Sequence, residues 1–173
     1  TDTPPNSAFS QSGSAYLFDT KTEALIATSR NPAPRNDAFY GANVDLDGSF
    51  AAIANYRDSS ETFQSGSIEV LETQGGAVLF PPKIDNPEPG NTDFFGWDVS
   101  VLGGFALVGA TFDNETERRG GKAYLIDLQT GQVIKSFVAP DIDEEDIFGF
   151  SVEDVSDYLA ISAPGDAQAG SGA

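Results

Sequence analysis

Apolar residues along this chain fall in runs of four to six, separated by glycine, aspartate, asparagine, threonine and proline. The runs are rich in valine, isoleucine, phenylalanine, tyrosine and alanine, a pattern typical of short strands joined by tight turns. In the middle of the chain four such runs lie at 67–72, 77–80, 97–101 and 105–110. Helical periodicity is nearly absent. The pattern predicts an all-β fold of antiparallel hairpins.

The residues between paired runs suit narrow hairpin turns. Turns of this kind need residues that tolerate positive φ, chiefly glycine, asparagine and aspartate. Such residues stand at each expected turn, namely Asp47-Gly48-Ser49, Gln74-Gly75-Gly76, Gly103-Gly104, Thr130-Gly131 and Ser156-Asp157.

The runs belong to a unit that occurs three times. Each copy has an aromatic residue, a glycine and a strand with valine, and these glycines are 55 and 53 residues apart. A second block begins thirteen residues after each glycine, and an aspartate follows four residues later. The recurring positions are Tyr40-Gly41, Phe95-Gly96 and Phe148-Gly149, then Ala54-Asn55-Tyr56, Gly109-Ala110-Thr111 and Ser162-Ala163-Pro164, then Asp58, Asp113 and Asp166.

A third block, a glycine followed by a strand that ends in an acidic residue, begins at Gly13, Gly66 and Gly121. The approximate units are therefore 13–58, 66–113 and 121–166, within one segment that spans 1–173. A period of this length marks supersecondary units that stack to bury a core. Four antiparallel strands per unit describe one propeller blade. The sequence predicts three four-stranded sheets, arranged as a partial propeller or open arc.

The order of these blocks resembles the FG-GAP repeat of integrin α-subunit propellers and of many secreted bacterial proteins. The resemblance covers essentially the whole chain; the copy at Phe148-Gly149 is the best match and the copy at Tyr40-Gly41 is degenerate. It implies a β-propeller in a secreted or cell-surface protein. The repeat is a scaffold used for many partners, so it implies little about the partner.

One departure from that family concerns calcium. Integrin-type repeats that bind calcium carry an Asp-x-Asp-x-Asp-Gly loop, and residues 43–48 imitate only its first half, with Ala51 where a closing carboxylate is expected. Calcium takes six to eight oxygens, more than Asp45 and Asp47 supply. We expect these two aspartates to form a hairpin turn, with calcium binding as the weaker alternative and no other cofactor. The chain more closely resembles the compact, metal-free version of the repeat.

Three blades do not close readily, since propellers have about four to eight. We therefore expect either a piece of a longer propeller or copies that associate, for example two chains giving six blades. Gly170-Ser171-Gly172-Ala173 resembles the opening of a fourth copy. An open stack would expose two apolar blade faces, which normally mark contacts.

Composition narrows the function classes. The chain has 27 acidic and 9 basic residues, a formal charge of −18, which disfavours nucleic acid and anionic lipid as partners. The acid excess fits solubility, a loose divalent-cation atmosphere or a basic protein partner. There is no cysteine or histidine, which excludes thiol chemistry and Ser-His-Asp catalysis. No apolar run approaches the roughly 20 residues of a membrane span. No carboxylate pair is singled out for glycoside hydrolysis, so no enzyme activity is expected.

The loops 4–12, 58–65, 113–120 and 166–170 stand at equivalent places and differ most, which favours them as the binding face. Our candidates lie in 113–120: Asp113, Asn114, Glu115, Arg118 and Arg119. Asn114-Glu115-Thr116 also fits a glycosylation acceptor, a pattern that arises by chance. The acidic run 141–146 is interpreted as a solvated loop.

Recurring residues are expected to do structural work. Asp58, Asp113 and Asp166 should cap backbone N–H groups of the loops that follow. Tyr40, Phe95 and Phe148 should pack between blades, and Trp97 either packs there or forms a binding platform.

The leading expectation is a non-enzymatic extracellular or cell-surface scaffold that binds a protein or glycan through its loops. One alternative is a self-assembling subunit that closes through blade faces into a ring or filament. The other is an accessory module of a larger secreted enzyme.

Overall fold

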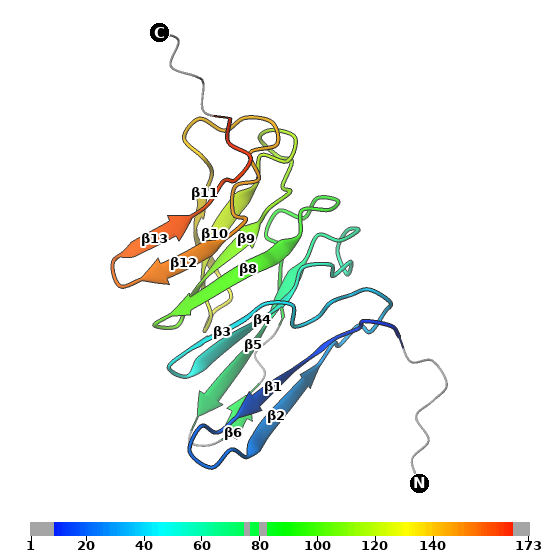
Figure 1. Cartoon of the computed structure of the whole chain (residues 1–173), viewed down its shortest axis with the longest axis vertical. Helices are drawn as coiled ribbons and strands as arrows, with labels where there is room; N and C mark the ends of the chain where they lie inside the picture. Colours follow the sequence, from blue (N-terminus) through cyan, green and yellow to red (C-terminus); the bar gives the residue numbers. More distant parts are fainter. Residues whose placement is uncertain (1–8, 75–76, 80–82, 168–173) are drawn as a thin grey trace.

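The structure is a computed structural model of the chain and describes residues 9–74, 77–79 and 83–167 (Figure 1). These residues form strands, turns and loops, without a helix among them, and so none of them forms a helix that could cross a bilayer. The strands are β1 (Ser14–Phe18), β2 (Leu25–Arg30), β3 (Val44–Asp47), β4 (Phe50–Asn55), β5 (Ser67–Gln74), β6 (Ala77–Leu79), β7 (Ile84–Asp85), β8 (Phe95–Leu102), β9 (Phe105–Ala110), β10 (Lys122–Asp127), β11 (Val133–Phe137), β12 (Val152–Val155) and β13 (Tyr158–Ile161).

The strands form four antiparallel sheets, as expected of propeller blades. Two sheets are complete blades, with strand orders β3-β4-β5-β6 and β8-β9-β10-β11, and short β7 also pairs with β5. The other two are half-sheets, β1-β2 and β12-β13. The predicted all-β blade fold is confirmed. The strands of the expected three sheets are divided into two whole sheets and two halves.

The sheets are offset by half from the sequence units. The loop after Asn55 returns the chain to the same sheet, where β4 pairs with β5 and Asn55 lies opposite Ser67. The connection after β6 instead carries the chain to the next sheet, where β8 begins at Phe95. Each complete sheet therefore joins the second half of one unit to the first half of the next.

The sheets follow one another along the long axis of the molecule (Figure 1). The half-sheet β1-β2 lies at one end of the stack and β12-β13 lies near the other. The turns between β3 and β4, β8 and β9, and β12 and β13 point to one side, and the long loops gather on the opposite side. The loops thus form one face of the molecule.

Apolar side chains fill the spaces between adjacent sheets. The largest cluster joins Ile68 and Val70 of β5 to Phe95 and Val108 of the next sheet. A second contains Phe148 with Leu107, and a third contains Tyr40. The recurring aromatics Tyr40, Phe95 and Phe148 are 2%, 0% and 9% exposed. Burying a side chain of this size contributes about 1.5–3 kcal/mol, so these rings hold neighbouring sheets together.

The innermost strands are also joined by side chains. Asp45 Oδ2 accepts a hydrogen bond from Val101 N at 2.6 Å, and Asp47 Oδ2 accepts one from Gly103 N at 2.8 Å. At the position equivalent to Asp45, Ser100 Oγ accepts from Asp154 N at 3.1 Å. Each inner strand therefore offers side-chain oxygens to the backbone of the next one along the stack, from β3 to β8 to β12.

Candidate binding face

Neighbouring loops of the loop face are joined to each other by backbone hydrogen bonds. The backbone N–H groups of Thr92 and Phe94 donate to the carbonyls of Phe63 and Gln64, respectively. The other two copies contain the equivalent pair of hydrogen bonds. Gly66, with φ of +91°, forms a parallel bridge with Phe95, and a Cβ there would overlap the Phe95 carbonyl. Each loop is thus fixed to the start of the next inner strand.

Several bulky residues in these loops have positive φ. Phe39, Phe94 and Ile147 stand at one repeat position, with φ of 55°, 57° and 60°. Positive φ is uncommon for bulky residues and is a true outlier for a β-branched one. Strain of this kind persists only where the surroundings enforce it, and it is common at binding sites. Here the backbone hydrogen bonds between neighbouring loops hold these residues in the strained conformation.

Six aromatic side chains form a continuous group, which we name the aromatic band. Phe39 lies 6.4 Å from Tyr56 between ring centroids, and Tyr56 lies 5.7 Å from Phe94. Trp97 contacts Tyr56 at 5.2 Å and Phe94 at 6.0 Å. The band consists of Phe39, Tyr56, Phe94, Trp97, Phe112 and Phe150. These separations are those of favourable aromatic pairs.

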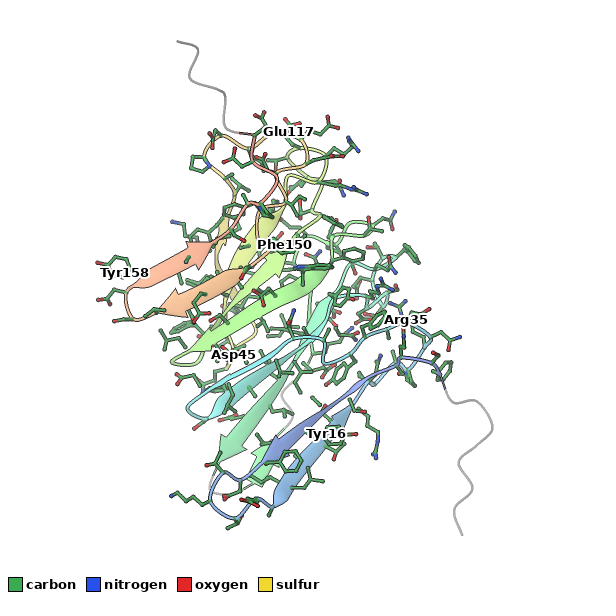
Figure 2. All side chains as sticks on the ribbon, in the orientation of Figure 1. Tyr16, Arg35, Asp45, Glu117, Phe150 and Tyr158 are labelled. Atoms are coloured by element: carbon green, nitrogen blue, oxygen red, sulfur yellow. The ribbon has the colours of Figure 1, made fainter. Side chains whose placement is uncertain are left out.

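The band is open to solvent along its length. Phe150 is 42% exposed and lies beside β8 (Figure 2), and the other five rings are half-buried. The Arg57 guanidinium carbon lies 4.8 Å from the centroid of Phe39, and that of Arg119 lies 5.0 Å from Phe112. Stacked guanidinium groups extend the flat surface and keep hydrogen-bond donors available. The band thus combines rigid rings with two cations.

Sequence reasoning singled out one member of this band. Trp97 was expected to pack between blades or to serve as a platform, and its ring touches Tyr56, which follows β4 of the preceding sheet, while remaining half-buried. Phe39, Tyr56, Phe94, Phe112 and Phe150 were missed. The available signal was an aromatic two residues before the recurring glycine in two of the three units.

The candidate residues of the loop 113–120 divide between two places. Asn114 Nδ2 donates to the Phe112 carbonyl at 2.7 Å, and its Oδ1 accepts from Arg119 N at 2.9 Å, which sets Arg119 over the band. Arg118 instead pairs with Glu144 and with Glu145, the latter at 2.9 Å. Asp113 is only 2% exposed, and its Oδ1 accepts from Glu115 N. Among these residues, Arg119 joins the aromatic band.

A hollow of about 340 Å³ lies between the loops at 88–93 and 113–115, and an ion network borders it. Glu88, Asp93, Asp113 and Glu115 line it, and Lys122 Nζ pairs with Glu88 at 2.8 Å and also with Glu115. The Lys122 hydrogen bond lowers the pKa of Glu88, while burial raises the pKa of Asp113. Within the described ranges, no group of three or more histidine, cysteine, aspartate or glutamate side chains is arranged so that it could hold a metal ion.

The other recurring aspartates differ in burial. Asp58 is 5% exposed; its Oδ1 accepts from Ser60 N at 3.1 Å, and its Oδ2 accepts from Ser67 Oγ and Lys83 Nζ, each at 2.8 Å. Asp166 is exposed and its backbone N–H donates to Ala163. Loop residues 4–8 and 168–170, Gly75-Gly76 and Gly170–Ala173 lie outside the described residues.

Comparison with known proteins supplies a family for part of the chain. Residues 83–126 match the FG-GAP repeat family. No curated protein matches the chain. The matched segment runs from the end of one sheet through β8, β9 and β10 and includes Phe95-Gly96. The match and the stacked antiparallel sheets fit a portion of an FG-GAP-like β-propeller.

Proposed function

We propose that this chain is a non-enzymatic β-propeller module of a secreted or cell-surface protein, and that it binds a protein partner through the aromatic band. FG-GAP repeats are typical of protein-binding propellers and of extracellular proteins. The sheets act as a rigid support, because cores and side-chain hydrogen bonds join each sheet to the next.

The observation that carries this proposal is the aromatic band itself. Tyrosine, tryptophan and arginine dominate the binding energy of protein interfaces, in clusters that lose water on contact. The band offers these residue types, with Trp97 near its middle and Arg57 and Arg119 stacked on its rings. A polypeptide surface with apolar side chains would bury the rings, and its carbonyls or carboxylates would accept from the guanidinium groups.

Preorganisation supports the same conclusion. The rings are held by tied loops and by neighbouring rings, so little side-chain freedom remains to be lost on binding. Catalysis would need titratable groups that converge on a substrate space. Of the four acids that line the 340 Å³ hollow, Glu88 and Glu115 instead form ion pairs with Lys122.

The test uses the chain as bait for a displayed peptide library and measures the affinity of selected peptides by fluorescence of Trp97, the single tryptophan. Phe150→Ala should weaken binding at least tenfold, because an interface aromatic is removed. Phe105→Ala is the matched control, since Phe105 is 41% exposed and begins β9 at the hairpin end of the sheets. Equal affinities of the two variants would contradict the assignment of the band.

A further inference from the structure

The two half-sheets are complementary parts of one blade. β1-β2 corresponds to β10-β11: both hairpins carry a bulge at the same place, after Leu17 and after Leu125. The turns also match, because Asp19 Oδ1 accepts two backbone N–H groups and Asp127 Oδ1 does the same. β12-β13 corresponds to β8-β9 at a distance of 53 residues along the sequence. Within residues 9–74, 77–79 and 83–167, β1-β2 is therefore left without inner strands and β12-β13 without outer strands.

An apolar groove lies beside β1, at the place where the described part of the chain supplies no inner strands. It has a volume of about 630 Å³ and is lined by β1 together with residues of β3 and β4, such as Val44, Leu46 and Ile53. Beside β5 and β10 the corresponding places are filled by the hairpins β3-β4 and β8-β9. A hairpin of the same kind is the shape that would fill the groove.

Equivalent residues show what this missing hairpin would cover. Val44 and Leu46 on β3 are 58% and 51% exposed, whereas their equivalents Val99 and Val101 on β8 are 6% and 4% exposed. β8 is covered by the preceding sheet, and β3 has no such neighbour among the described residues.

The β1 side of the groove shows the same contrast. Tyr16 is 61% exposed and its equivalent Tyr124 is 1% exposed, while Phe18 is 56% exposed and its equivalent Ile126 is fully buried. Tyr124 and Ile126 are buried in a core cluster formed with the β8-β9 hairpin of their own sheet and with β4 and β5 of the preceding sheet. Tyr16 and Phe18 have no such cover among the described residues.

We propose that β12-β13 of one copy fills this groove of a second copy, so that two chains associate head to tail and complete each other's half-sheets. β13 of one chain would pair antiparallel with β1 of the other, as β9 pairs with β10. The register transferred from Leu107↔Leu125 and Ala106↔Ile126 places Ala160 opposite Leu17 and Leu159 opposite Phe18.

A chain cannot fill its own groove, because Tyr16 on β1 and Tyr158 on β13 lie at opposite ends of the stack (Figure 2). Each chain contributes the strands of three blades, as two whole sheets and two halves. Propellers have about four to eight blades, and two copies arranged in this way would give six. Such an arrangement would fill both grooves.

The side-chain hydrogen bonds of the inner strands extend the same way. Glu153 stands where Asp45 and Ser100 accept hydrogen bonds from the next inner strand. The donors there are Val101 N and Asp154 N, and the equivalent donor on the partner copy is Leu46 N. Glu153 is exposed, so its carboxylate is available to accept from that N–H group.

Charge opposes this association. Each chain has a formal charge of −18, so two chains repel each other at low ionic strength. Salt screens this repulsion and strengthens the apolar contact. The association should therefore tighten as salt is added, unlike one driven by ion pairs.

The first test measures the mass of the full chain in solution by light scattering, over a range of concentrations and at about 0.05 M and 0.5 M salt. We expect a particle of twice the 18.2 kDa chain mass, with a larger dimer fraction at the higher salt. Leu46→Arg should weaken dimerisation at least tenfold, because a charge would be buried in the groove. Val133→Arg, on the outer strand β11, should leave it unchanged. A monomer at every concentration would overturn the proposal.

The second test fixes the register. The chain has no cysteine, so introduced ones are unique. Leu17→Cys and Ala160→Cys on separate chains should form a disulfide when mixed and oxidised, since paired strands bring Cα atoms within bridging distance. Tyr158→Cys, two residues out of register, should form far less with Leu17→Cys. Equal yields from the two pairs would refute the transferred register, and no mixed disulfide from either would refute the contact.

Discussion

Asp93 offers a direct test of how burial in the loop face affects stability. Its side chain is 2% exposed, and its Oδ2 accepts hydrogen bonds from Gly90 N at 2.5 Å and Asn86 Nδ2 at 2.9 Å. Burial is the largest influence and raises its pKa; the Gly90 hydrogen bond lowers it and the charge of Asp113 raises it, to about 6. An unfolded aspartate has a pKa near 3.8.

The sign of the pH dependence follows from these two values. Between pH 4 and 6 the folded chain holds a proton on Asp93 that the unfolded chain has released, so this group makes stability fall as the pH rises. The difference of about two pKa units corresponds to about 3 kcal/mol lost once the pH is well above 6. Asp93→Asn removes the charge and hence this loss.

The assay is urea unfolding of both proteins, followed by Trp97 fluorescence, at pH values from about 4.5 to 7.5. The free energy of unfolding of Asp93→Asn, minus that of the natural chain, should increase by about 2 kcal/mol over this range. The denaturant slope should not change, because the same surface is exposed on unfolding. A difference that stays constant within about 0.5 kcal/mol would refute the reasoning.

Three further predictions concern the scaffold. Gly66→Ala should cost about 3 kcal/mol or more of unfolding free energy in urea, whereas Gly48→Ala, at φ of +57° with nothing within 4 Å, should cost about 1 kcal/mol; equal losses would show that the bridge to the next sheet is not the cause. Lys83→Met should cost about 2 kcal/mol at neutral pH by leaving the buried Asp58 carboxylate without its cation, and an unchanged urea midpoint would rule out that pairing. Calcium at millimolar concentration should leave the thermal midpoint within about 1 °C of its value in a chelator, because the two β3 carboxylates already accept backbone hydrogen bonds; a marked rise would restore them as calcium ligands.

The repeat allowed the sheets and their packing to be predicted, because strand pattern and burial follow the same period. Tyr40, Phe95 and Phe148 are buried where one sheet meets the next. The division into whole and half-sheets was harder to foresee. It depends on which loop returns to its own sheet, and both loop types are rich in glycine and polar residues.

The aromatic band was less predictable than the scaffold because its members do not repeat fully. Phe39 and Phe94 share a position that Ile147 occupies in the last unit, and Trp97 shares one with Ala42 and Phe150. A search for recurring residues therefore passes over them. The guanidinium groups of Arg57 and Arg119 meet the rings of Phe39 and Phe112 only in the folded chain. The spacing of these residues along the sequence does not predict the contacts.

Joining the two proposals gives the assembly a property that neither has alone. The position equivalent to Phe112 in the last unit is Gly165, so in a ring of two chains each aromatic band would end at the junction with the next copy. The ring would then present two separate bands on one face, and a partner with two matching sites would bind both. The second contact is intramolecular and raises the apparent affinity 10²–10⁴-fold without a new type of contact. Leu46→Arg should remove this gain for a bivalent partner and leave the affinity for a single-site peptide unchanged, because the groove and the band share no residue.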